Sequence, residues 1–360
     1  PHRDCINNIL DVVVDQFDEL YDPGVYISRT ARHSHGRRVE AVLKISANDL
    51  PAARQLSGQA SHAHTHGCNV CDTPVQDLDN LNMATWHIRN WEEEKQWGLA
   101  WKNATSIMEQ EEIYELHGLR YSPLQRLPTF DVIMCTVLDT MHMFAEGLIP
   151  THLRKVYGMD RNTVDGAGLA TFSGRRSSEE DFSAGFYVLQ WGNDSLLTGL
   201  KERLAEIDHD AETLILPSSM QAAPKSAGER KGGKFKAASW LTYALVNLPI
   251  TLIRLWGGAP PDSRERAMLD NYMHLVKAIR LASLPYMTSE VIESYTSEMH
   301  RYLTTLLELF PGTTITIYQH LSLHLPLLLA EHGPTHAWRC WVVERMNHVL
   351  QTLNTNNKFG

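Results

Sequence analysis

The stretch "HTHGCNVCD", residues 64 to 72, constrains the fold more than any other part of the sequence. Its Cys-x-x-Cys pair, Cys68 and Cys71, can supply two of the four ligands that zinc usually takes. A metal held there would tie this loop to the remaining ligands. The loop is therefore a complete local site, half of a site finished elsewhere in the chain, or a solvated loop without metal. The local candidates for the missing ligands are His62, His64 and His66.

The remote candidates for the missing ligands are two histidines near the end of the chain. His320 and His324, in "QHLSLH", are four residues apart and share one face of a predicted helix. Together with the cysteines they would close a tetrahedral site, whereas a site built from residues 62–71 alone would be crowded. Paired histidines on an apolar helix are often simply packed in the core, and the spacing by itself favours that interpretation. All three interpretations stay open at this point.

Composition places the chain among globular proteins of a reducing compartment. The 360 residues, 43% of them hydrophobic and 21% charged, suffice for one large domain or two ordinary ones. The five cysteines form one close pair and three single residues, which is unlike a secreted disulfide framework. No stretch approaches about 18 uninterrupted apolar residues, so we expect no membrane partner. Because the chain starts without Met or a signal pattern, we expect it to be an interior piece of a longer protein.

The charge distribution is uneven. The net charge of −9, taken alone, disfavours nucleic-acid binding. Positive runs nevertheless occur at residues 29–38 and 225–236, and the second contains a cluster of three lysines that could contact phosphates. A solvated loop explains the same cluster equally well. The lysines are Lys231, Lys234 and Lys236.

Hydrophobic periodicity predicts one strand near the start and many helices after it. Residues 38–50 are rich in β-branched and aliphatic residues and are predicted to form a buried strand that delivers Asp49 at its carboxyl end. Pro51 fits the first turn of a following helix. Helices are further predicted at 6–20, within 84–117, and at 136–158, 237–256, 262–283, 286–309 and 336–354, while 313–333 begins β-rich and becomes helical. Residues 160–184 and 217–236 are predicted to be loops.

Several blocks of the sequence, in register from about residue 20 to residue 360, resemble the transposases of CACTA (En/Spm-like) DNA transposons, especially fungal copies. The strongest is "NDLPAARQLSGQASHAHTHGCNVCD". "LYDPGVYISRTARHSHGRRV" precedes it, and "HGLRYSPLQRLPTFDVIMCTVLDTMHMFAEGL", "LDNYMHLV" and "WVVERMNHVLQTLNTNNKFG" follow in the order of the family.

The resemblance implies a DDE-type enzyme with an RNase H-like core and a large all-helical insertion. In such enzymes three carboxylates hold two divalent ions, Mg²⁺ or Mn²⁺, which activate the attacking oxygen and stabilise the leaving oxygen at phosphorus. Asp49 matches the second acid and Glu344 the third. The first acid is expected upstream of residue 1, so the chain alone is expected not to cleave DNA. The implied division is a partial core at 1–80, the insertion at 81–312 and a return to the core at 313–360.

The resemblance also selects the remote histidines. In the related recombinase core of V(D)J recombination, a Cys-x-x-Cys after the second acid and two histidines before the Glu bind structural zinc. Cys68, Cys71, His320 and His324 occupy those positions here.

Asp139 and His142 match the family's Asp-x-x-His motif, for which a structural role is at least as reasonable as a catalytic one. Duplex DNA (transposon ends and target), a homodimer and a nuclear location follow as expectations. The chain departs mildly from the family's pattern, which leaves open a decaying or domesticated copy; the departures are Thr140, Val342, Val343 and His348. The alternative is therefore a catalytically dead, transposase-derived DNA-binding or scaffold protein. A further alternative treats residues 62–71 as a metallohydrolase centre with a single catalytic zinc.

Overall fold

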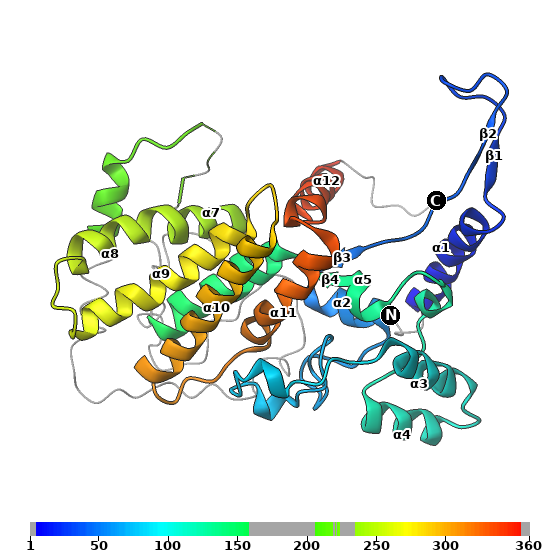
Figure 1. The fold of residues 1–360 in the computed structure, drawn as a ribbon, viewed down its shortest axis with the longest axis horizontal. Helices are drawn as coiled ribbons and strands as arrows, with labels where there is room; N and C mark the ends of the chain where they lie inside the picture. The colour runs from blue at the N-terminus through cyan, green and yellow to red at the C-terminus, as the bar shows by residue number, and fades with distance from the viewer. Residues whose placement is uncertain (1–4, 158–205, 219, 221, 224–234, 354–360) are drawn as a thin grey trace. The chain divides into compact units, whose positions relative to one another are not determined.

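The computed structural model describes residues 5–157, 206–218, 220, 222–223 and 235–353. It divides into two compact units, drawn as one ribbon in Figure 1. Unit 1 comprises residues 1–77 and 82–139, and unit 2 comprises 78–81 and 140–360. The main division thus follows Asp139, and residues 82–139, expected at the start of a helical insertion, pack in unit 1.

Unit 1 begins with the predicted helix, α1 (Cys5–Tyr21), followed by a β-hairpin of β1 (Val25–Ile27) and β2 (Arg37–Val39). A third short strand, β3 (Ser46–Asn48), is separate from this hairpin. The strand predicted over 38–50 is therefore only partly correct. Its first residues pair backward with β1, in the register Val25↔Val39, and only its last residues form the strand that precedes Asp49.

The second sheet is a parallel pair of β3 and β4 (Thr136–Leu138), with Asn48 opposite Leu138. All three β4 residues are buried, and the strand follows the short helix α5 (Val132–Cys135). The prediction of a helix over the whole of 136–158 was therefore wrong at its start. Three apolar residues fit either structure, and only the pairing with β3 decides between them.

Helix capping explains where the other helices of unit 1 begin and end. Asp49 caps α2 (Leu50–Ser57), accepting a bond from the Ala52 N–H at 2.7 Å. Gly58 ends this helix in the left-handed region, with φ +81°. Asn90 and Ser106 cap α3 (Trp91–Asn103) and α4 (Ile107–His117), the two helices predicted within 84–117. Short 3-10 turns lie at η1 (Val75–Asp77), η2 (Met83–Thr85) and η3 (Pro123–Arg126).

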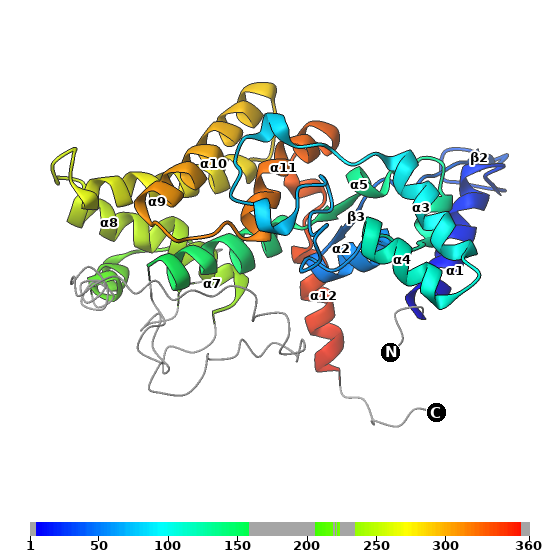
Figure 2. The ribbon, with the colours of Figure 1, turned by 90° about the horizontal axis from the view of Figure 1, so that it is seen from below.

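Every secondary-structure element that the structure describes in unit 2 is helical. The π-helical segments η4 (Met141–Leu148) and η5 (Thr151–Val156) open it. Helices α9 (Arg264–Ala282) and α10 (Ser289–Leu309) lie side by side (Figure 2). Buried Asn271 joins them, donating to the Tyr302 carbonyl at 2.8 Å and to the Thr305 hydroxyl at 2.7 Å. The helices α11 (Ile317–His332) and α12 (Trp341–Thr352), with the short turn η10 (Thr335–Ala337) between them, complete the unit.

One stretch of unit 2, Ala237–Trp256, is long and apolar enough to cross a membrane by composition alone. It consists of α7 (Ala237–Thr242), the π-helical turn η9 (Tyr243–Asn247) and α8 (Leu248–Trp256). About half of it, 56%, is buried inside the protein, and the Tyr272 hydroxyl donates to the Ala244 carbonyl at 2.7 Å. These contacts are those of a core helix.

Candidate metal centre

The Cys68–Cys71 loop of unit 1 has the backbone geometry of a metal-binding knuckle. The N–H groups of Val70 and Cys71 point at the Cys68 sulfur, at 3.3 and 3.4 Å. Both cysteine side chains are fully buried. Residues after the loop return beside it, because the Arg89 N–H bonds the Val70 carbonyl and Cys71 is bridged to Ile88. The loop is therefore held in shape by its own chain before any metal is considered.

Two arginines with buried side chains donate hydrogen bonds to the backbone of the loop and of the residues before it. Arg89 directs its Nε–H at the carbonyls of Cys68 and Cys71, both at 3.0 Å, and pairs through Nη1 with Glu94 Oε1 at 3.0 Å. Arg54 donates to the carbonyls of Ala60 and of His66, the second at 2.7 Å. Gln59 completes the network by donating to Glu94 and to the Asn69 carbonyl.

These arginines were missed in the sequence because a charged residue is ordinarily read as a surface residue. Arg54, which is 2% exposed, belongs to the quoted "NDLPAAR" block, and that was the one available signal.

The electrostatics of the loop favour a thiolate at Cys68. Burial raises the pKa of the Cys68 thiol, but hydrogen bonds from Cys71 and from the Val70 N–H outweigh burial and lower the pKa to about 7. The positive charge of Arg54 acts in the same direction. Zinc binds the thiolate and not the thiol, so a lowered pKa reduces the cost of losing the proton.

The histidine pair lies on α11 of unit 2, in a helix that tolerates an internal proline. Pro326 has no N–H, which leaves the Ser322 carbonyl one turn earlier without its helical partner. The Tyr295 hydroxyl of α10 donates to that carbonyl at 2.8 Å. Thr316 and Gln319 form a capping box at the start of the helix. Helix α11 is thus fixed at its first turn, just before His320, and at Ser322, between the two histidines.

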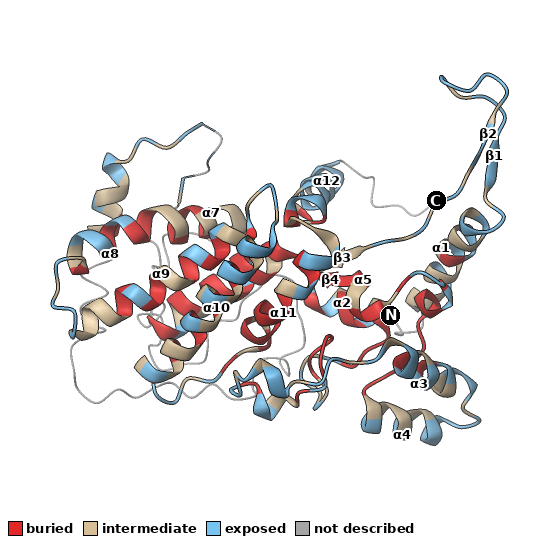
Figure 3. Cartoon of the chain, in the orientation of Figure 1, coloured by how far each residue is buried: buried red, intermediate tan, exposed pale blue. Residues whose placement is uncertain are grey.

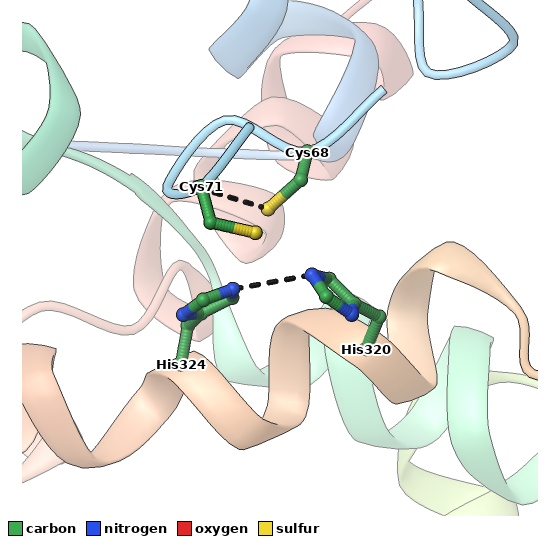
Figure 4. A group of neighbouring side chains, drawn as sticks. All are labelled: Cys68, Cys71, His320 and His324. Carbon is green, nitrogen blue, oxygen red and sulfur yellow. Dashed lines mark hydrogen bonds between the residues drawn. The ribbon is translucent and has the colours of Figure 1, made fainter. Parts of the chain in front are cut away.

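His320 and His324 are buried, and their Nε2 atoms are 3.2 Å apart. Two nitrogen ligands of one tetrahedral zinc, each bound at 2.0–2.1 Å, are separated by about 3.3 Å. One ligand atom from each of Cys68, Cys71, His320 and His324 lies within 4.8 Å of the other three (Figure 4). The four residues form a candidate metal-binding group.

The segment that follows the cysteine loop belongs to the same unit as the histidine helix. Asp79, eight residues after Cys71, belongs to unit 2, where its carboxylate accepts the Ile315 N–H at 2.6 Å just before α11. The Leu81 carbonyl, beside it, lies 3.2 Å from the His300 ring on α10. Eight residues span at most about 28 Å when fully extended. The covalent chain therefore sets only an upper limit on the distance between Cys71 and Asp79.

The local histidines have other contacts. The His64 and His66 rings stack with centroids 5.6 Å apart, His66 Nε2 lies 3.1 Å from the Leu116 carbonyl, and His64 Nε2 lies 3.8 Å from Glu115. Burial lowers the pKa of both. Neither these two histidines nor His62 is part of the four-residue group.

Two acidic residues end the two parallel strands of unit 1. Asp49 follows β3 and Asp139 follows β4, and the Asp139 N–H donates to the Asn48 carbonyl at 2.8 Å. They continue the strand register, so their backbones stand roughly 5 Å apart at the same edge. Asp49 is exposed and Asp139 is fully buried. The prediction that Asp49 ends a strand is confirmed.

The remaining predicted residues are placed as follows. Glu344 is exposed in the first turn of α12 in unit 2, so a metal shared with Asp49 stays a prediction. His142 lies in η4, 4.0 Å from Glu146. Lys236 is exposed at the start of α7. Lys231 and Lys234, like the loop predicted at 160–184, lie outside the described residues.

The comparisons with known proteins assign no family to the chain. No family model matches the chain, and no curated protein matches it.

Proposed function

We propose that the chain is the core of a DDE-type transposase, related to those of CACTA elements, that cleaves and joins DNA by divalent-metal chemistry. The observation that carries the proposal is the parallel β3–β4 pair, whose carboxyl ends bear Asp49 and Asp139. Ligands of open α/β sheets bind at the carboxyl ends of the strands. The proposal takes this pair as part of an RNase H-like sheet.

The proposed catalytic ligands are the carboxylates of Asp49 and Glu344. Hard oxygen ligands suit Mg²⁺, which in proteins uses few carboxylates and keeps several waters. Both residues are exposed, as a site that admits DNA phosphates requires. A bound pair of Mg²⁺ or Mn²⁺ ions would supply an activated oxygen nucleophile and stabilise the leaving oxygen. The residues' own task is to fix the ions, while buried Asp139 holds the end of the strand beside Asp49.

For the Cys68, Cys71, His320 and His324 group we propose a structural zinc. Two thiolates and two imidazoles are a ligand set of closed, four-coordinate zinc sites. No position remains for a substrate, which argues against a single catalytic zinc. The ion would clasp the segment that follows Asp49 to the segment that precedes Glu344, and so hold together chain regions far apart in sequence.

The test is a nicking assay on labelled duplex taken from the DNA that flanks the coding sequence, with Mg²⁺ or Mn²⁺. Asp49→Asn and Glu344→Gln should abolish cleavage by the chain expressed together with the upstream coding sequence in which the first acid is expected. Asparagine is as good a helix cap as aspartate, so Asp49→Asn leaves α2 intact. The matched controls are Asp131→Asn, at the N-cap of α5, and Glu290→Gln, in the exposed first turn of α10. Both controls should retain cleavage.

Two outcomes contradict the proposal. Cleavage that survives Asp49→Asn would show that the acids are misassigned. Tight binding of the flanking duplex without cleavage, even when any upstream coding sequence is included, would favour a catalytically dead DNA-binding protein.

A further inference from the structure

The β1–β2 hairpin of unit 1 stands out from the helices as a narrow arm. Figure 1 shows it extending beyond α1, and Figure 3 shows that its surface is almost entirely exposed. Its base is anchored to α1, because the Gly24 N–H donates to the Glu19 carbonyl and the Ala41 N–H to the Leu20 carbonyl. The arm is therefore fixed at one end and open to solvent along its length.

Hydrogen bonds fix the turn at the tip of the arm. The Thr30 N–H donates to the His33 carbonyl at 3.0 Å, and the His33 N–H returns to the Thr30 hydroxyl at 3.0 Å. The Tyr26 hydroxyl donates to the His35 carbonyl. Gly36 has φ +81°, and a Cβ there would meet the Tyr26 hydroxyl at 2.5 Å. The turn thus has a defined shape that does not depend on the charged side chains.

The arm is strongly basic in an acidic protein. Between residues 25 and 38 there are four arginines and no acidic residue, against a net charge of −9 for the chain. Arg38, near the base, pairs with Glu40 at 3.0 Å. Among the described residues, none with a carboxylate forms an ion pair with Arg29, Arg32 or Arg37, which carry the positive charge toward the tip.

We propose that the β1–β2 arm binds duplex DNA, laying its arginines against backbone phosphates along the major groove. That groove, about 12 Å wide in B-DNA, admits a two-stranded β-ribbon. Arginine suits the contact because its planar guanidinium bonds phosphate oxygens in pairs. The surface is not one that the catalytic proposal uses. It rests on the proposed function only for its choice of DNA as the natural partner.

The composition of the tip disfavours other partners. Residues 28–36 contain no large apolar or aromatic side chain except two histidines, so the tip has little to bury in a membrane. Proteins that bind single strands stack successive bases on several exposed aromatic side chains. The arm has one exposed tyrosine, Tyr26, whose hydroxyl is bonded to the turn. The major groove of A-form RNA is too narrow for side chains to read.

The test measures binding of the 360-residue chain to a random-sequence DNA duplex by fluorescence anisotropy over a range of salt concentrations. The variant Arg29→Gln/Arg32→Gln/Arg37→Gln removes three charges from the arm. If each arginine meets one phosphate, the slope of log affinity against log salt should become shallower by about 2.7, with roughly tenfold or greater loss of affinity near 0.1 M salt. The corresponding triple Arg→Lys variant should keep most of the slope.

The matched control, Lys277→Gln/Arg280→Gln/Arg301→Gln, removes the same charge from exposed positions of α9 and α10. It should leave the slope nearly unchanged. An equal loss in the control, or no loss in the arm variant, would overturn the proposal. So would an equal loss on an RNA duplex of the same sequence, which would assign the arm to RNA. The assay involves no cleavage and no catalytic acid, so its failure is distinct from failure of the transposase proposal.

Discussion

Replacing Arg89 by methionine should destabilise unit 1 and loosen the cysteine loop. The substitution keeps much of the aliphatic stem but removes the guanidinium. The Cys68 and Cys71 carbonyls lose a donor at 3.0 Å, and Glu94 loses its ion pair. Glu94 is then a buried carboxylate that retains Gln59 but has lost the counter-charge it was bonded to.

The expected cost is about 3 to 5 kcal/mol, the range for removing one partner of a buried ion pair. Solvent screens little of this, because the two side chains are only 8% and 4% exposed. Burial raises the pKa of Glu94 while the charge of Arg89 lowers it. Without Arg89 the pKa rises further, so Glu94 can take up a proton, and this places the cost toward the lower end of the range.

The assay is urea unfolding at neutral pH, followed by hydrogen exchange at the Val70 and Cys71 amides. Adding Glu94→Gln to Arg89→Met should recover roughly 1 to 2 kcal/mol, since it removes the stranded charge. The matched control is Arg266→Met, which breaks an exposed pair with Asp270 and should cost under about 1 kcal/mol. Equal effects at Arg89 and Arg266, or no recovery in the double variant, would refute the reasoning.

Three further outcomes are expected. The chain should bind about one zinc ion, measured by elemental analysis. His324→Ala should lose zinc and stability together, whereas His64→Ala should keep both. The reverse pattern would favour the local histidines as ligands. Burial lowers the pKa of His152 to about 3, below its unfolded value near 6.5. The free energy of unfolding should therefore be highest above pH 6.5 and fall by roughly 1.4 kcal/mol per pH unit as the pH drops from 6.5 toward 3. His152→Gln should remove that part of the urea-midpoint dependence between pH 7 and 5, and an unchanged dependence would contradict the assignment. Gly58→Ala forces alanine into the left-handed region with its Cβ 2.5 Å from the Arg120 carbonyl, and should lower thermal stability by at least about 1 to 2 kcal/mol; Gly258→Ala, which meets nothing within 4 Å, is the control.

The helices could be predicted from sequence because their signals are local. Apolar periodicity and capping residues locate α1, α9 and α10 to within a few residues. The strands could not be located as well. β3 and β4 are three residues each, and their identity depends on a pairing between segments about ninety positions apart. A short apolar run carries no information about a partner that far away.

The candidate site could be predicted only in part, for a similar reason. The Cys68–Cys71 spacing indicates a metal by itself, but His320 and His324 have the spacing of ordinary core residues, and their selection depended on the family resemblance. Arg89 and Glu94 carry no signal in the sequence, because a buried charge pair looks like two surface residues until the packing around it is known.

The assignment of residues 78–81 to unit 2 affects how the protein can be made. The Asp79 carboxylate caps the backbone at Ile315, which is synthesised 236 residues later. At about 5 to 20 residues per second on the ribosome, that interval is roughly 12 to 47 s. During this time the segment has left the ribosome without its helical partner. Its neighbours in the chain, residues 1–77 and 82–139, can meanwhile fold as unit 1.

Because residues 78–81 belong to unit 2, neither unit is encoded by one continuous segment of the gene. Expression of residues 140–360 would leave Ile315 without Asp79 and His300 without the Leu81 carbonyl. Expression of residues 1–139 would include residues 78–81 without their partners in unit 2. Domain-boundary trials on this protein should therefore keep residues 78–81 with unit 2, for example by grafting them through a linker.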